Sequence, residues 1–136
     1  MSYDIFVQDL PASASSVDEI PADFVPSPLG PRQSIIDGIL DVIPTADFSN
    51  PTWGRIDSDD WSIEVNIGEK DPCTSFAFHV RGGSEALGAV AAILERLVFR
   101  ALDTSEGGIF SADQASVESF GRWRDYRSQV VGSNDR

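Results

Sequence analysis

The sequence predicts an α+β domain, a two-layer sandwich in which helices cover one face of a mainly antiparallel sheet. Two stretches of alternating residues, 61–67 and 74–81, are joined by a short loop, as two antiparallel strands are. Each stretch has one apolar and one polar side, which is typical of a sheet that packs on one face only. Gly82 and Gly83 then break the second strand, and the most apolar helix of the chain follows over residues 84–97.

The alternation separates a core face from a polar face, because successive side chains of a strand point to opposite sides. The core face of the two strands would carry Trp61, Ile63, Val65, Ile67, Phe76, Phe78 and Val80. The polar face would also include an N-terminal strand over residues 3–9, and it would carry Asp4, Gln8, Glu64, Asn66, His79 and Arg81. With the helices added, the predicted core comprises Trp61, Ile63, Val65, Phe76, Phe78, Leu87, Val90, Leu94, Ile36, Ile39 and Leu40.

The first half of the chain holds a long connection and a helix. Residues 11–30 contain four prolines and no basic residue. We expect Phe24 and Val25 to pin this connection to the domain surface, and the functional alternative is a lid over a pocket. Pro31 is suited to the start of a helix that ends before Pro44, and a short strand over 53–57 follows.

The second half continues from the helix over 84–97, whose buried stripe is predicted to be Leu87, Val90, Ala91, Leu94 and Leu97. A strand over 98–102 and a brief pairing at 109–110 come next. The order is therefore strand, helix, three strands, helix, strand and a last helix. Among named architectures a ferredoxin-like variant is the nearest to this order.

The last helix is predicted over 111–130, because Ser111 and Gln114 have the spacing of a capping box. Its aromatic side chains are too large to leave in water, and they are Phe120, Trp123 and Tyr126. The helix therefore either folds back on its own domain or docks on a second copy. In both cases we expect its seat on the polar face of the sheet, near Phe6 and Ala77, and a homodimer is the favoured assembly.

The composition describes one acidic domain of 136 residues with a formal net charge of −12. Residues 1–72 hold 14 acids and 3 bases. Such a charge argues against binding to nucleic acid or to an anionic membrane, and it makes a basic protein partner or a cation electrostatically suited. The alternative is that the charge serves solubility alone. Because the chain shows no membrane span and no secretion signal, and Cys73 is its single cysteine, we expect a cytoplasmic protein.

Three blocks of the chain, 3–9, 61–67 and 75–83, resemble a small group of uncharacterised bacterial proteins. The resemblance extends over most of the chain. No activity is established for that group, so the resemblance assigns no role to any residue of this sequence.

The polar face is the best place for chemistry in this sequence. A catalytic site there would use His79 with Glu64 as an acid–base pair and Arg81 to hold an anionic group. Asn66, Gln8 and Asp4 are the candidates for ligand binding. The alternative is an ordinary solvated sheet face, since a single histidine without a nucleophile or a metal partner does not define an active site.

The sequence predicts no metal site and no cofactor. Asp57, Asp59 and Asp60 crowd one turn and are the candidates for a divalent cation, but the stretch lacks the glycine and the final glutamate of a calcium loop. An ordinary hairpin turn is the alternative. The function that we expect is that of a non-catalytic protein-interaction domain, for example of the immunity or antitoxin kind, and the rival is a small enzyme at His79.

Overall fold

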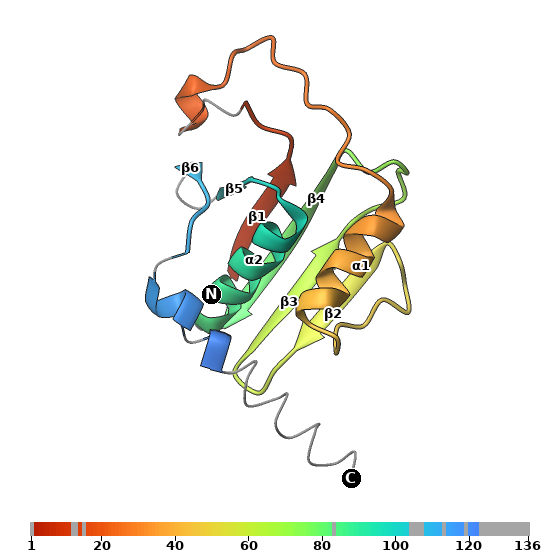
Figure 1. Ribbon diagram of the computed structural model, residues 1–136, viewed down its shortest axis with the longest axis vertical. Helices are drawn as coiled ribbons and strands as arrows, with labels where there is room; N and C mark the ends of the chain where they lie inside the picture. Colours follow the sequence, from red (N-terminus) through yellow and green to blue (C-terminus); the bar gives the residue numbers. More distant parts are fainter. Residues whose placement is uncertain are drawn as a thin grey trace.

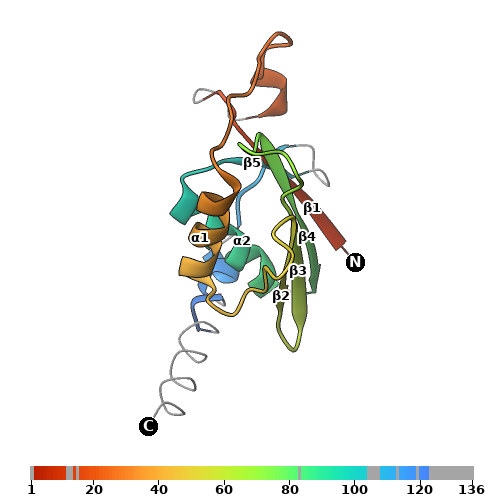
Figure 2. The same ribbon diagram turned by 90° about the vertical axis from the view of Figure 1, so that its right-hand side faces the viewer.

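A computed structural model describes residues 2–11, 14, 16–82, 84–103, 108–112, 114–118 and 120–122. It shows an α+β fold in which one six-stranded antiparallel sheet is packed against helices (Figure 1). Both α-helices between the strands lie on the same side of the sheet, as the view along the sheet shows (Figure 2). The predicted fold class is therefore confirmed.

The elements follow the predicted order. They are β1 (Ser2–Gln8), the short 3₁₀ helix η1 (Val17–Glu19), α1 (Arg32–Val42), β2 (Trp53–Asp57), β3 (Trp61–Asn66), β4 (Ser75–Gly82), α2 (Ser84–Leu97), β5 (Ala101–Asp103) and β6 (Gly108–Ile109). Residues 114–118 and 120–122 are also helical. β5 begins three residues later than predicted, because Val98 adopts a left-handed backbone conformation that ends α2 with a tight turn.

The strand order in the sheet is β2-β3-β4-β1-β5-β6. Without the two edge strands, the order β3-β4-β1-β5 with a helix after β1 and after β4 has the connectivity of a split βαβ, the ferredoxin-like pattern that we expected. β2 and β6 extend this arrangement at its two edges. The first strand of the chain thus lies near the middle of the sheet, between β4 and β5.

The core lies between the sheet and the two helices. Every predicted core residue is buried except Leu40 and Leu87, which are partly buried against it. The predicted stripe of α2 is wrong in part: Leu87, Ala91 and Leu97 are half-buried, whereas the fully buried side chains of this helix are Ala86, Ala89, Val90 and Ile93. The stripe is rotated because α2 is covered from several sides, by β3 and β4, by α1 and by the last helix.

The two helices approach each other closely at a glycine. A Cβ atom on Gly38 of α1 would lie 2.2 Å from Leu97 Cδ2 of α2, so the missing side chain makes room for this leucine. An exposed ion pair between Asp41 and Arg96, with 2.6 Å between Oδ2 and Nη2, bridges the same two helices.

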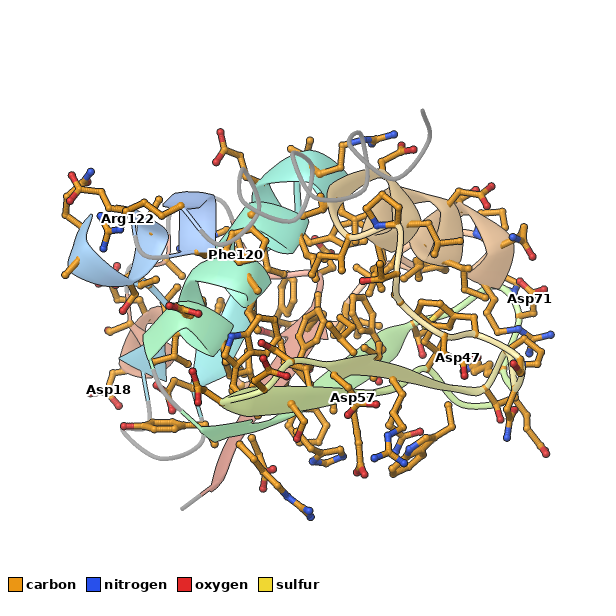
Figure 3. The ribbon with its side chains drawn as sticks, turned by 90° about the horizontal axis from the view of Figure 1, so that it is seen from below. Asp18, Asp47, Asp57, Asp71, Phe120 and Arg122 are labelled. Atoms are coloured by element: carbon orange, nitrogen blue, oxygen red, sulfur yellow. The ribbon has the colours of Figure 1, made fainter. Side chains whose placement is uncertain are left out.

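The last helix packs on α2 and not on the polar face of the sheet. A Cβ on Gly88 would lie 2.1 Å from the Ser116 carbonyl oxygen and 2.8 Å from Phe120 Cβ, and the Phe120 ring is buried. Figure 3 shows Phe120 among the helices, with Asp57 on the opposite side of the sheet. The predicted seat near Phe6 and Ala77 is therefore wrong for residues 114–118 and 120–122, because Gly88 lets this segment approach α2 closely. Trp123 and Tyr126 lie outside the described residues.

The connection over 11–30 is held at its far end by main-chain and carboxylate contacts. Asp9 Oδ2 accepts a hydrogen bond from the Ser27 amide at 2.9 Å. The Leu29 amide donates to the Cys73 carbonyl at 2.7 Å, and the Cys73 amide donates to the Gly30 carbonyl at 2.8 Å. These bonds tie the connection to the end of β1 and to the loop before β4.

The near end of the connection is held by Arg100, whose guanidinium donates to the carbonyls of Pro11, at 2.7 Å, and of Ala14. The expectation that Phe24 and Val25 pin the segment is wrong for Val25, which is 82% exposed, while Phe24 is half-buried. The polar contacts at both ends hold the segment, so its middle needs no apolar anchor of that size. Figure 1 shows this middle part extending away from the sheet.

Candidate functional site

The candidate site is the side of the sheet that faces away from α1 and α2, which we call the outer face (Figure 2). It is formed by Asp4, Phe6, Gln8, Trp53, Arg55, Asp57, Ser62, Glu64, Asn66, Ser75, Ala77, His79 and Arg81. All six residues predicted for the polar face are among them. The pairing of β4 with β1 on one side and β3 on the other places His79 directly between Asp4 and Glu64.

His79 is oriented by a carboxylate. Its Nδ1 lies 2.8 Å from Asp4 Oδ1, a contact that spans two neighbouring strands. Because a carboxylate can only accept, Nδ1 is the nitrogen that donates in this contact. Nε2 is then the ring nitrogen that a ligand could contact. Among the described residues, the carboxylate that bonds His79 is Asp4, whereas Glu64 lies beside it in register without a hydrogen bond to the ring.

Trp53 completes this group by stacking on His79. The ring centroids are 5.8 Å apart and the planes are inclined by 20°. Trp53 is on β2 and His79 on β4, so the indole reaches across β3. Sequence reasoning did not place Trp53 on this face, although Ile56 in the same short strand is buried and the period of two then puts Trp53, Arg55 and Asp57 on the opposite side.

The charges on the outer face have both signs. Arg55 Nε lies 3.4 Å from Asp57 Oδ2, and both side chains are well exposed, so the pair adds little stability. Arg81 is exposed and faces Ser62 across the strand boundary, two residues from His79 along β4. The predicted trio of His79, Glu64 and Arg81 therefore shares one face, with His79 and Glu64 as direct cross-strand neighbours.

The predicted metal candidates do not form a cluster. Asp57 pairs with Arg55, and Asp59 and Asp60 lie exposed in the turn between β2 and β3. Within the described part of the chain, no three side chains of His, Cys, Asp or Glu converge as metal ligands would.

The single cysteine is a buried structural residue. Cys73 Sγ lies 3.1 Å from the Ser75 carbonyl oxygen, which accepts its weak hydrogen bond. Burial raises the pKa of the thiol above its ordinary value. A thiol that is protonated and shielded in this way is unsuited to nucleophilic chemistry.

Three of the cavities are lined by described residues that do not include His79. One of about 270 Å³ lies at the end of β1 and includes Gln8, a predicted ligand-binding residue. A second, of about 170 Å³, lies between α2 and residues 109–112, and a third, open one adjoins Arg81 and the turn between β2 and β3. The His79 side chain lies on the outer face and is 31% exposed.

No helix in the described part of the chain combines the length and the apolarity that crossing a bilayer requires. The outer face is exposed to solvent as a broad surface, with its aromatic and charged side chains held by the register of four strands.

The chain matches no protein-family model, no curated protein and no solved structure.

Proposed function

We propose that this protein is an interaction domain that binds a basic protein partner through the outer face of its sheet. The observation that carries the proposal is the exposure of two large aromatic side chains on this face, Phe6 at 43% and Trp53 at 39%. Arg55 and Arg81 lie on the same face. Aromatic residues and arginine are the types enriched at the centres of protein interfaces, where they contribute most of the binding energy.

Trp53 is also well prepared for binding. It stacks on His79, which in turn is held by Asp4, so the indole is ordered before a partner arrives. A side chain that is already ordered loses less conformational entropy on binding than a free one.

The charge of the whole chain favours a basic partner. A net charge of −12 attracts a basic protein over long distances and speeds the encounter. The outer face itself carries acids and bases in similar number, so it supports recognition of a particular arrangement of charges rather than general attraction. An inhibitor that covers a basic protein, of the immunity or antitoxin kind, is one form of this function, and the reducing cytoplasm is the compartment that we propose for it.

The experiment is affinity capture from the protein's own cells, with matched surface variants. The outer-face variants are Trp53→Ala and Phe6→Ala, and the control is Val25→Ala, which removes an exposed apolar side chain from the 11–30 connection. We expect the control to capture a stoichiometric basic partner as the wild type does, and the outer-face variants to capture at least tenfold less of it. The amount captured by the wild type should fall at high salt. Equal capture by all three variants, or capture of chaperones alone, would refute the proposal.

Two other predictions are decided by related measurements. If the bound protein is a second copy of the chain, sedimentation of the wild type shows a dimer that Trp53→Ala dissociates.

The enzyme at His79 stays a prediction, and its one supporting observation is the Asp4–His79 pair. A catalytic role predicts that His79→Gln abolishes turnover of a substrate, whereas Trp53→Ala, which leaves the Asp4–His79 pair in place, retains it.

A further inference from the structure

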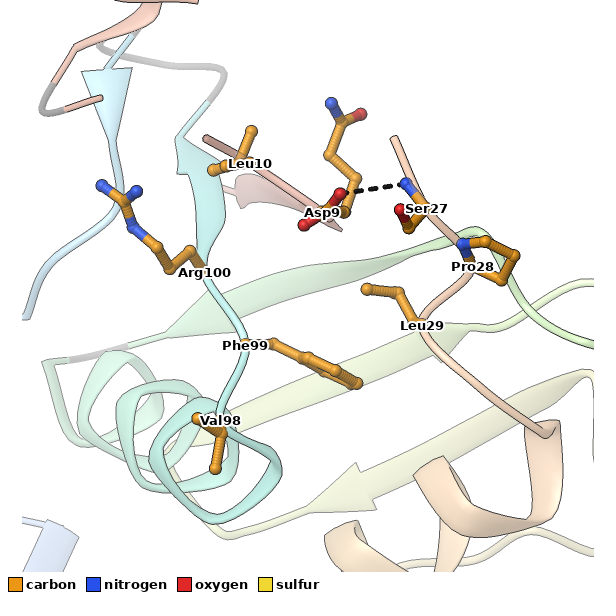
Figure 4. A pocket seen from close by; sticks show the side chains of 9 residues that line it. Asp9, Leu10, Ser27, Pro28, Leu29, Val98, Phe99 and Arg100 are labelled. Carbon is orange, nitrogen blue, oxygen red and sulfur yellow. Dashed lines mark hydrogen bonds between the residues drawn. The ribbon is translucent and has the colours of Figure 1, made fainter. Parts of the chain in front are cut away.

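A separate site lies where β1 ends, under the last part of the 11–30 connection (Figure 4). The cavity there has a volume of about 270 Å³. Three segments that are distant in sequence enclose it: residues 8–10 after β1, residues 27–29 of the connection, and residues 98–100 between α2 and β5. This volume is close to the lower end of the range of small-molecule sites in proteins.

The third of these segments begins with a strained residue. Val98 has φ of 60° and is 86% exposed, so no burial of its side chain accounts for the conformation. A β-branched residue is an outlier in this region, which the end of a helix normally assigns to glycine. The turn is nonetheless complete, because the Val98 amide donates to Glu95 and the Phe99 amide to Leu94. Backbone strain of this kind concentrates at ligand-binding positions.

The strained turn directs the side chains of Phe99 and Arg100 toward different partners. Phe99 is half-buried, with its ring at the cavity and in edge contact with Phe76, 6.3 Å between centroids. Arg100 also lines the cavity, but its guanidinium donates to the carbonyls of Pro11 and Ala14, so its hydrogen-bond donors are directed at the protein. The aromatic part of the cavity wall from this segment is the Phe99 ring.

Asp9 supplies the negative charge of the cavity. Its Oδ2 accepts the hydrogen bond from the Ser27 amide, and this leaves Oδ1 as an acceptor for a ligand (Figure 4). Leu10, Leu29 and Phe99 provide apolar lining of the same cavity. A carboxylate and an aromatic ring that line one cavity suit an organic cation, since both attract positive charge.

We propose that this cavity binds a small organic cation, a protonated amine that carries a short aromatic or apolar group. The ammonium group donates to Asp9 Oδ1, and the apolar group packs against Phe99 and Leu29. The negative field of the whole chain raises the local concentration of such a cation. The proposal explains why the connection over 11–30 is tied down beside the cavity at its end and why the strain at Val98 is retained.

The first test is a titration of the wild-type protein with a series of ligands, in which two-dimensional ¹⁵N–¹H NMR detects binding. The probes are phenethylamine, the neutral 2-phenylethanol and the anionic phenylacetate. Each carries a phenyl ring on a two-carbon group, and they differ in the polar group at its end. We expect phenethylamine to shift the amide signals of Leu10, Leu29 and Phe99 and to bind at least tenfold more tightly than the alcohol. Equal binding of amine and alcohol, or shifts confined to other residues, would overturn the proposal.

The second test uses matched carboxylate variants. Asp9→Asn removes the charge but keeps an oxygen that accepts the Ser27 hydrogen bond. Asp23→Asn removes one charge from an exposed position of the same connection that does not line the cavity. We expect the affinity for phenethylamine to fall at least tenfold in Asp9→Asn and to stay within twofold in Asp23→Asn. Equal losses in both variants would overturn the assignment of Asp9, and if Asp9→Asn does not fold, the wild-type ligand series decides alone.

Discussion

Replacing Gly88 by alanine tests how the last helix sits on the domain. In an exposed helix, Gly→Ala stabilises by about 1 kcal/mol, because alanine has the higher helix propensity. Here the new methyl group would lie 2.1 Å from the Ser116 carbonyl oxygen, far inside van der Waals contact. The last helix must then move or detach from α2.

The size of the effect follows from these opposing terms. Overpacking of this kind costs about 1–3 kcal/mol, and detachment would expose Phe120 at a similar cost of about 1.5–3 kcal/mol. After subtraction of the propensity gain of about 1 kcal/mol, we expect Gly88→Ala to lower the free energy of unfolding by up to about 2 kcal/mol. Gly121→Ala is the matched control, since this helical position has nothing within 4 Å of a new Cβ and should gain up to about 1 kcal/mol.

The assay is urea unfolding of the full-length variants, monitored by tryptophan fluorescence and analysed by the linear extrapolation. Opposite signs for the two substitutions support the packing of Phe120 against α2. If Gly88→Ala is as stabilising as Gly121→Ala, the last helix does not lie on α2 and the reasoning is refuted. Truncation after Phe110 gives an independent check, because it should destabilise the chain without changing its oligomeric state in sedimentation.

Four further predictions concern single residues. Phe78→Ala should lower the free energy of unfolding by ~3–5 kcal/mol, because this ring is fully buried in the centre of the sheet, and a loss below about 1 kcal/mol in urea would contradict the core. Val98→Gly should raise the free energy of unfolding by up to ~1 kcal/mol, because it relieves about 1–2 kcal/mol of backbone strain, part of which is offset by the flexibility of glycine in the unfolded chain. A lowered melting temperature would contradict the strain. Asp71→Ala should cost ~0.5–2 kcal/mol, because Asp71 Oδ1 accepts from the Arg32 amide at the start of α1 at 3.1 Å, whereas Asp71→Ser should recover part of the loss. For Cys73, whose pKa is raised in the fold, stability should fall as the pH rises above the ordinary value of 9.0, because the unfolded thiol then loses its proton first; rapid alkylation of the native protein at pH 8 would contradict its burial.

Most of the outer face could be predicted because the residue alternation in β1, β3 and β4 is regular. A period of two decides the face of every residue once one apolar side is known to be buried. The contact of Trp53 with His79 could not be predicted in this way, since it depends on the relative register of strands that are joined through an intervening hairpin. The choice of Asp4 over Glu64 as the partner of His79 depends on the same register, on the side of β1.

The position of the last helix was predicted wrongly because the alternation offered only the sheet as a surface. The signal that could have corrected it is Gly88, a glycine inside the most apolar helix, where a close neighbour is the usual reason for its presence. The conformation of Val98 had no signal in the sequence, because a β-branched residue argues for a strand and not for a left-handed turn. The cavity beside it was therefore missed as well, although Gln8 was named.

The place of β1 in the sheet has a consequence for synthesis on the ribosome. β1 leaves the ribosome before β4 and β5, its two neighbours in the sheet, so its backbone waits until residues 75–103 have been made. At translation rates of about 5–20 residues per second, this alternating apolar strand stays unpaired for several seconds, with both edges open to other chains. The 14 acids against 3 bases of residues 1–72 cover this same interval, and we expect their mutual repulsion to keep nascent chains apart until the middle of the sheet can close.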